Sequence, residues 1–293
     1  MIPGAIALLI PSCPNHPEAN QPPEVAACGE DAPHKRRRLN HEEFLARQLH
    51  QGKSVSPLFS VQGVTTAVFR RDWLHTADQG VSADFLGNVF HRLCKILPGA
   101  NRKERRTFLL AEIQRWYQEE NVSDRLVGLR SWGIRAPKQP PKLKSSAAAC
   151  RALVPFAHAK AREYLDQDDP VDAAITHAAR ALHECYKCLS LSEDDWSIRL
   201  QAASEDFATQ YKALRAASGA SKEWVIKPKM HQFLELCASA SAPALSWTYR
   251  DEDYGGSIAQ LCRVKGGAWS KVSSYCRRVL VLFKTQNDVP RIV

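Results

Sequence analysis

Apolar residues spaced three and four apart run from residue 102 to residue 222, and this spacing limits the stretch to amphipathic helices. The first of these helices places five large side chains on a single stripe: Phe108, Leu109, Ile113, Trp116 and Tyr117. Asp169 followed by Pro170 begins a later helix, because a capping acid before proline is typical of a first helical turn. The sequence therefore predicts a helical bundle over residues 102–222.

The segments on either side of this block carry strand signals as well as helical ones. Residues 57–69 are rich in Val and Thr, which predicts one or two strands. Ser82 is expected to cap a helix whose apolar face follows directly. Residues 245–249 are again strand-like, so the expected fold class is α+β and mostly α.

The first 34 residues are crowded with proline and lack periodicity, which predicts a disordered tail. A compact basic run follows at once, formed by Lys35, Arg36, Arg37 and Arg38. A basic run in a flexible setting is typical of a nuclear localisation signal, and on this basis we expect a nuclear protein. The alternative is that the four residues form only a solvated charge cluster.

The charge of the chain is uneven. Its net charge is +9, and residues 1–34 contribute −4 because they contain four acids and no Lys or Arg, so the remainder carries +13. A body this basic suits a polyanionic partner such as nucleic acid, although an ordinary basic protein has the same composition. No apolar run approaches the roughly 20 residues needed to cross a bilayer, so no membrane association is expected.

Clusters of basic residues are the candidate contacts to DNA phosphates. They are Arg102, Lys103, Arg105 and Arg106, then Lys142 and Lys144, then Arg277 and Arg278. Each cluster also fits a solvated helix face. Cys185 and Cys188 have the spacing of zinc ligands, but they fall within a helix and no second pair accompanies them, so core cysteines are expected there.

Two short motifs carry groups that could do chemistry. Asp72 and His75 are separated by two residues, which also fits an acid that caps a turn beside a hydrogen-bonded imidazole. Asp251, Glu252 and Asp253 lie between aromatic residues, which also fits the acidic start of a helix.

In this order, with a helical block between them, the motifs resemble the C-terminal half of a cut-and-paste DNA transposase of the CACTA (En/Spm-like) type. The D-x-x-H signature of that family is matched by Asp72 and His75. Its P-K-x-H-x-L segment is matched at Pro228, Lys229 and His231, with Phe233 in place of leucine. Its W-x-Y-x-x-E-x-Y-x-G stretch is matched by Trp247, Tyr249, Glu252, Tyr254 and Gly256. Similar arrangements occur in uncharacterised repetitive protein families of protists, and the resemblance covers about residues 57–285.

The resemblance implies a partial RNase H-like core, with few strands, that a large helical insertion interrupts. Residues 1–39 would be the tail, residues 40–101 the first part of the core, residues 102–222 the insertion and residues 223–293 the last part of the core. The family chemistry uses two Mg²⁺ ions held by three carboxylates. Glu252 matches the third acid, and Asp251 or Asp253 replaces it if the register differs by one.

The first two acids should precede Asp72, yet none of the acids in residues 1–71 lies on a recognisable strand. We therefore expect a chain that lacks the front of the core and is inactive by itself, with Mg²⁺ as cofactor only if catalysis occurs.

The leading hypothesis is thus a truncated or domesticated transposase relative that binds DNA nonspecifically through its basic surface. One alternative is a helical protein-protein interaction module, which exposed Trp and Tyr side chains would support. Another is an Mg²⁺-dependent transposase or nuclease completed by missing N-terminal sequence or by another chain. The transposase interpretation requires the turn near His75 and the Glu252 carboxylate to converge beside one small sheet.

Overall fold

The computed structural model describes residues 39–68, 71–126, 134, 139–189, 195–239, 242–243, 247–249, 252 and 255–256. The chain divides into two compact units, Met1–Ser246 and Trp247–Val293. The described residues are mostly helical and contain no strand. None of the described helices is long and apolar enough to span a membrane.

Helix α1 (His41–His50) begins at a capping box, in which the Asn40 side chain accepts the Glu43 N–H and the Glu43 carboxylate accepts the Asn40 N–H. The strands expected in residues 57–69 are wrong for the described part of that range. Two 3₁₀ turns occupy it, η3 (Pro57–Ser60) and η4 (Thr66–Val68). The physical reason is local, because Pro57 brings no N–H for a ladder and the Ser56 hydroxyl accepts the Leu58 N–H at 3.3 Å, which starts a turn.

The centre of the first unit is one continuous helix made of η5 (Leu74–Ser82), which is a π-helix, and α2 (Ala83–Ile96). Nearly every side chain of α2 is buried, which is typical of a helix enclosed on all sides. The predicted helix after Ser82 is confirmed, but Ser82 does not cap it. Ser82 has helical backbone angles because η5 runs directly into α2.

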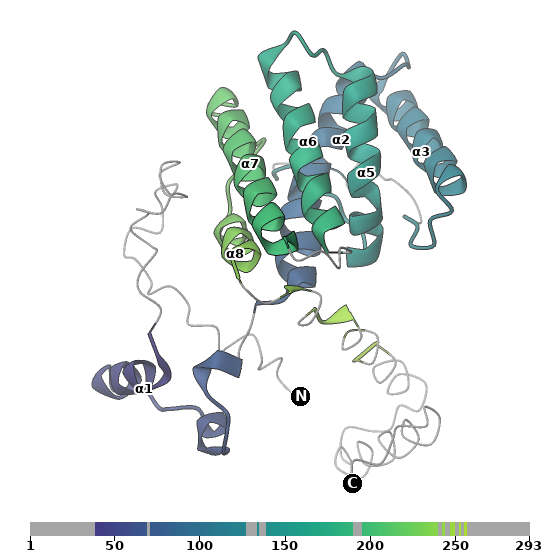
Figure 1. The fold of residues 1–293 in the computed structure, drawn as a ribbon. Helices are drawn as coiled ribbons and strands as arrows, with labels where there is room; N and C mark the ends of the chain where they lie inside the picture. The colour runs from purple at the N-terminus through teal and green to yellow at the C-terminus, as the bar shows by residue number, and fades with distance from the viewer. Residues whose placement is uncertain are drawn as a thin grey trace, which may run out of the picture. The chain divides into compact units, whose positions relative to one another are not determined.

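Five further helices surround this central helix. They are α3 (Arg102–Glu119), α5 (Ala147–Tyr164), α6 (Pro170–Cys188), α7 (Trp196–Ala217) and α8 (Pro228–Cys237). Helices α5, α6 and α7 stand side by side in Figure 1, with α2 behind α5 and α6. Helix α8 contacts both η5 and α7. The predicted helical block therefore packs directly around α2 and α8.

Aromatic side chains fill the space between α2, α7 and α8. The Phe85 ring lies 5.4 Å from the Phe207 ring, and the Phe207 ring lies 6.0 Å from the Phe233 ring. Trp73 continues the cluster at 5.7 Å from Phe233. All four side chains are fully buried, so the cluster provides a large part of the apolar burial that holds the three helices together.

The segment that leads into α5 lies against α2 at Gly87. A Cβ on Gly87 would overlap the backbone of Lys142, so glycine permits this close approach. The Leu143 N–H donates to the Ala83 carbonyl oxygen at 2.8 Å. The start of α2 thereby fixes where Lys142 lies.

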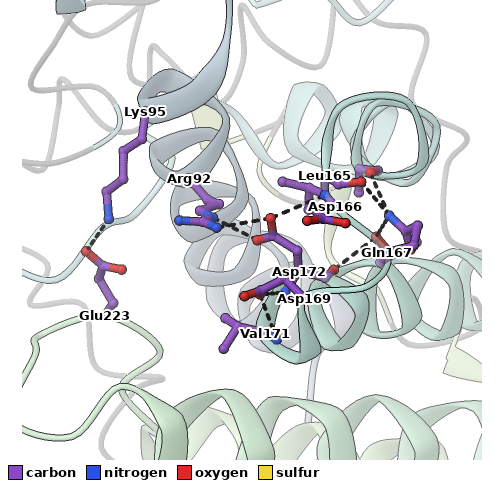
Figure 2. Close-up of polar contacts among 11 residues, drawn as sticks. Arg92, Lys95, Leu165, Asp166, Gln167, Asp169, Val171, Asp172 and Glu223 are labelled. Carbon is purple, nitrogen blue, oxygen red and sulfur yellow. Dashed lines mark hydrogen bonds and ion pairs between the residues drawn. The ribbon is translucent and has the colours of Figure 1, made fainter.

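Polar contacts tie the far end of α2 to its neighbours, as Figure 2 shows. Arg92 Nε and Nη2 donate to the two oxygens of the Asp172 carboxylate at 2.7 and 3.0 Å. The Glu223 carboxylate accepts from Lys95 Nζ at 3.0 Å and lies 3.3 Å from His91 Nε2. These contacts lower the pKa of Glu223 to about 2, mainly through the hydrogen bond with His91 and then through Lys95.

Among the ion pairs at this end of α2, the bidentate pair of Arg92 and Asp172 should contribute most to the stability of the fold. Asp172 is buried, with 4% of its side chain exposed, so Arg92→Met leaves a buried carboxylate without its guanidinium. We expect the free energy of unfolding to fall by about 2–3 kcal/mol. The matched control is Arg115→Met, which removes an exposed guanidinium from Glu112 while Lys160 keeps that carboxylate paired. Chemical denaturation measures both variants, and equal losses would contradict the assignment.

The lowered pKa of Glu223 gives a prediction for acid unfolding. Because the folded value is about 2 against an ordinary 4.5, the stabilisation is present above pH 4.5 and is lost as the pH falls toward 2. Glu223→Gln carries no such titration. It should therefore be less stable than the wild type at neutral pH and show a shallower fall of melting temperature between pH 4.5 and pH 2. Identical pH slopes for the two proteins would refute the assignment.

Candidate nucleic-acid interface

The Asp72 carboxylate caps the start of the central helix. It accepts the N–H of Leu74 at 3.2 Å and that of His75 at 2.9 Å, and it lies 2.5 Å from Nδ1 of the His75 ring. An acid that accepts the free N–H groups of a first helical turn is a helix cap. The geometry of Asp72 and His75 thus matches the simpler of the two interpretations that the sequence allowed.

A buried polar contact holds η5 against α6. The Tyr186 hydroxyl donates to Asp78 Oδ1 at 2.5 Å and lies 2.8 Å from the Ser82 hydroxyl. Asp78 is fully buried. Burial, together with the charge of Asp78, raises the pKa of Tyr186 well above its ordinary value, so this phenol keeps its proton and acts as a donor.

Three half-buried lysines contact η5 and the start of α2, and we call Lys142, Lys227 and Lys229 the lysine cluster. Lys142 Nζ donates to the Gln79 carbonyl oxygen and Lys229 Nζ to the His75 carbonyl oxygen, each at 2.8 Å. Lys227 Nζ donates to Asp84 Oδ1 at 2.7 Å. The cluster joins the segment before α5 to the start of α8.

Positive charge exceeds negative charge at this cluster. Lys142 also lies 4.0 Å from Asp84, so this carboxylate serves two of the three ammonium groups. Burial lowers the pKa of Lys229, and the nearby charges of Lys142 and Lys227 lower it further, while Asp84 and Asp72 act in the opposite sense. The depression beside Lys227 and Lys229 holds only about 10 Å³, too little for a small molecule. The cluster is thus a positively charged surface and not a pocket.

The structure brings together two of the sequence motifs that lie far apart in the chain. Lys229, from the P-K-x-H segment, bonds the carbonyl of His75, from the D-x-x-H segment. Beside them Arg71 forms an ion pair with Glu235, whose carboxylate also lies 3.4 Å from His231 Nε2. Both motifs therefore lie at the contact between η5 and α8.

The basic residues at the start of α3 divide into internal and exposed groups. Arg105 donates to the carbonyls of Gly99 at 3.0 Å and Lys95 at 2.6 Å, which satisfies the end of α2. Arg102 Nη2 lies 3.2 Å from His91 Nδ1. Lys103 is exposed and Arg106 is half-buried. Arg105 thus has a structural role, and Lys103 remains an exposed candidate for a phosphate contact.

The other candidate residues lie elsewhere. Lys144 is exposed in the segment before α5. Glu252 belongs to the second unit, where its N–H donates to the Thr248 carbonyl oxygen at 2.9 Å. Its convergence with His75 stays a prediction. Several residues lie outside the described ranges: Lys35, Arg36, Arg37, Arg38, Asp251, Asp253, Arg277 and Arg278.

Metal ligands are not assembled in the described part of the chain. No three His, Cys, Asp or Glu side chains there lie close enough together to hold a metal ion. Cys185 and Cys188 are buried free thiols, as expected, and burial raises the pKa of both.

Sequence analysis missed two members of the lysine cluster. Lys229 entered the sequence analysis only as part of the P-K-x-H-x-L match, and Lys227 did not enter it at all. No sequence pattern indicates the cluster, because Lys142 and Lys227 meet at Asp84 only in the folded chain.

Comparisons of the chain with protein-family models, curated proteins and solved structures found no match in any of the three.

The capping role of Asp72 can be tested by substitution. Asp72→Ala leaves the first N–H groups of the central helix without an acceptor, and we expect a loss of about 1 kcal/mol in unfolding free energy. Asp72→Asn and Asp72→Ser retain an acceptor and should lose much less. Thermal denaturation would compare them with Asp168→Ala, an exposed loop change expected to be nearly neutral. A loss in Asp72→Asn as large as in Asp72→Ala would argue against capping.

Proposed function

We propose that this chain binds DNA nonspecifically through the lysine cluster and through Lys144, which is exposed two residues after Lys142. In this proposal the chain is a catalytically inactive relative of the CACTA-type transposases. One observation carries the proposal. Segments 85 residues apart in the sequence, at Lys142 and Lys227, place three ammonium groups near only two carboxylates, those of Asp84 and Asp72. A phosphate backbone supplies the negative charge that this surface lacks.

The chemistry of the cluster favours backbone binding over base recognition. Lysine ammonium groups contact phosphates as point charges and release the counterions condensed on DNA. Such contacts do not distinguish one sequence from another. The shallow surface beside the lysines also suits an extended polyanion better than a small ligand.

The transposase part of the proposal rests on the resemblance and on the contact between its two motifs. Lys229 and His75 would belong to one surface of the ancestral domain. The partial RNase H-like core, the metal-binding role of Glu252 and a nuclear location directed by residues 35–38 remain predictions. DNA binding by the lysine cluster depends on none of them.

The interaction-module alternative gains no support from the described residues. Trp or Tyr side chains exposed on a helix face would support an interaction module. Every Trp and Tyr that the structure describes is instead buried or half-buried. The large apolar side chains exposed in the described ranges are aliphatic: Leu49, Leu58, Val61, Val68, Ile96 and Ile198.

A charge-neutralising double variant tests DNA binding. Lys142→Gln with Lys229→Gln should weaken binding to duplexes of unrelated sequence to the same extent. It should also reduce the slope of log affinity against log salt by about 1.8, since each lost phosphate contact removes about 0.9. Fluorescence anisotropy of a labelled duplex, titrated between about 50 and 200 mM salt, measures both effects.

Two control proteins make the result interpretable. Lys187→Gln with Lys212→Gln removes the same charge from α6 and α7 and should keep the wild-type slope. Lys142→Arg with Lys229→Arg keeps the charge at the cluster and should keep most of the affinity. An unchanged slope in the Gln variant, or no affinity of the wild type for DNA at low salt, would end the proposal.

A further inference from the structure

A second positively charged site lies between α5 and α6. An open cavity of about 460 Å³ is lined there by His158, Arg162, Gln167, Thr176, His177 and Arg180. Its lining residues come from the second half of α5, from the connection to α6 and from α6 up to Arg180, two helices that stand side by side in Figure 1. The lysine cluster instead contacts η5 and the start of α2. The cavity is thus separate from the surface proposed to bind DNA.

The lining of this cavity is suited to an anion. Two guanidinium groups and two imidazoles line it, and none of its six lining residues carries a carboxylate. Arg180 Nη2 donates to Asp206 Oδ2 at 3.0 Å, which orients the guanidinium and leaves its other N–H groups for a ligand.

The polar residues between the cations are already engaged in the fold. Gln167 Nε2 donates to the Leu165 carbonyl oxygen at 2.9 Å and to the Thr176 hydroxyl at 3.2 Å, and Figure 2 shows Gln167 beside Leu165. The Thr176 hydroxyl donates to the Asp172 carbonyl oxygen at 3.1 Å. These bonds fix the end of the cavity next to the buried pair of Arg92 and Asp172.

Both burial and neighbouring positive charge act on the pKa of His158. Burial lowers the pKa of His158, and the charges of Arg162, Lys187 and Arg180 lower it further, with Glu184 acting in the opposite sense. The neighbouring His183 has its pKa lowered by burial, by Lys187 and by His158, and the two Nδ1 atoms lie 3.5 Å apart. A bound anion would relieve this mutual repulsion.

We propose that this cavity binds the phosphate monoester of a small polar molecule. Such a group carries a charge of about −1.5 to −2 at neutral pH and offers three acceptor oxygens. The planar N–H groups of Arg162 and Arg180 match that geometry better than lysine would. The cavity is larger than one phosphate and lies within the range of small-molecule sites, so there is room for the organic part of the ligand.

The site should also couple binding to protonation. An anion stabilises the charged form of His158, so binding raises the pKa of this imidazole and takes up a proton. Affinity for an anion whose own charge stays constant should therefore increase as the pH falls through the range in which His158 titrates. Sulfate remains a dianion over that range and is a suitable probe.

Calorimetric titration of the full chain tests the proposal, with adenosine monophosphate and inorganic phosphate as probes. Both should bind, and adenosine should not. Arg162→Gln with Arg180→Gln should weaken binding by about 10-fold or more, because two charge-assisted contacts are lost. Arg162→Lys, which keeps the charge without the planar donors, should lose less. Arg47→Gln in α1 is the control that should bind like the wild type.

Two further measurements test the proposed anion site: the pH dependence of sulfate binding, and binding by the variant with Gln at positions 142 and 229. Sulfate affinity should rise on acidification in the wild type and rise less steeply in His158→Gln, in which one of the two imidazoles of the lining is lost. The variant with Gln at positions 142 and 229 should still bind adenosine monophosphate. The proposal is overturned if neither phosphate probe binds, if the double arginine variant binds like the wild type, or if the lysine variant is the one that loses binding.

Discussion

The burial of one continuous helix, η5 followed by α2, is the constraint on which the rest of the first unit depends. A helix enclosed on all sides has no solvent face on which to place its polar residues, so each must find a partner within the protein. Asp84, Asn88 and Arg92 follow one another at intervals of four and therefore lie along one face. They bind Lys227, the Trp224 N–H and Asp172 respectively, at 2.7, 3.0 and 2.7 Å.

This polar row explains how distant segments come into register. A neighbouring segment could make apolar contacts with α2 at many positions along its axis. A buried carboxylate or amide finds its hydrogen-bond partner at only one of these positions. Asp84 fixes the entry to α8 and so places Lys227, and Arg92 fixes the first turn of α6 next to the cavity. Both candidate binding sites are therefore positioned by the same helix, although they lie toward different ends of the bundle.

The helical block and several of its caps were predictable because they depend on neighbours in the sequence. Asp169 caps a helix as expected, and Asn40 caps α1 in the same way, since a cap needs only the N–H groups two or three residues on. The strands expected in residues 57–69 failed for a local reason, the turn that begins at Ser56 and Pro57. The capping role of Ser82 was wrong for a long-range one. Whether η5 continues into α2 is decided by Tyr186, more than 100 residues away, which bonds both Asp78 and Ser82. The lysine cluster, likewise, exists only after the chain has folded.

The way in which the cluster is held bears on how it would act. Lys142 and Lys229 each use one donor on a main-chain carbonyl of η5, so each ammonium group keeps two donors for another acceptor. A lysine that is already ordered loses less side-chain entropy on meeting a phosphate than a freely rotating one. The carbonyls are neutral, so the only negative charge near these two ammonium groups in the described contacts is that of Asp84 and Asp72. A surface organised in this way favours a polyanion without requiring any one sequence, because its selectivity lies in charge and spacing alone.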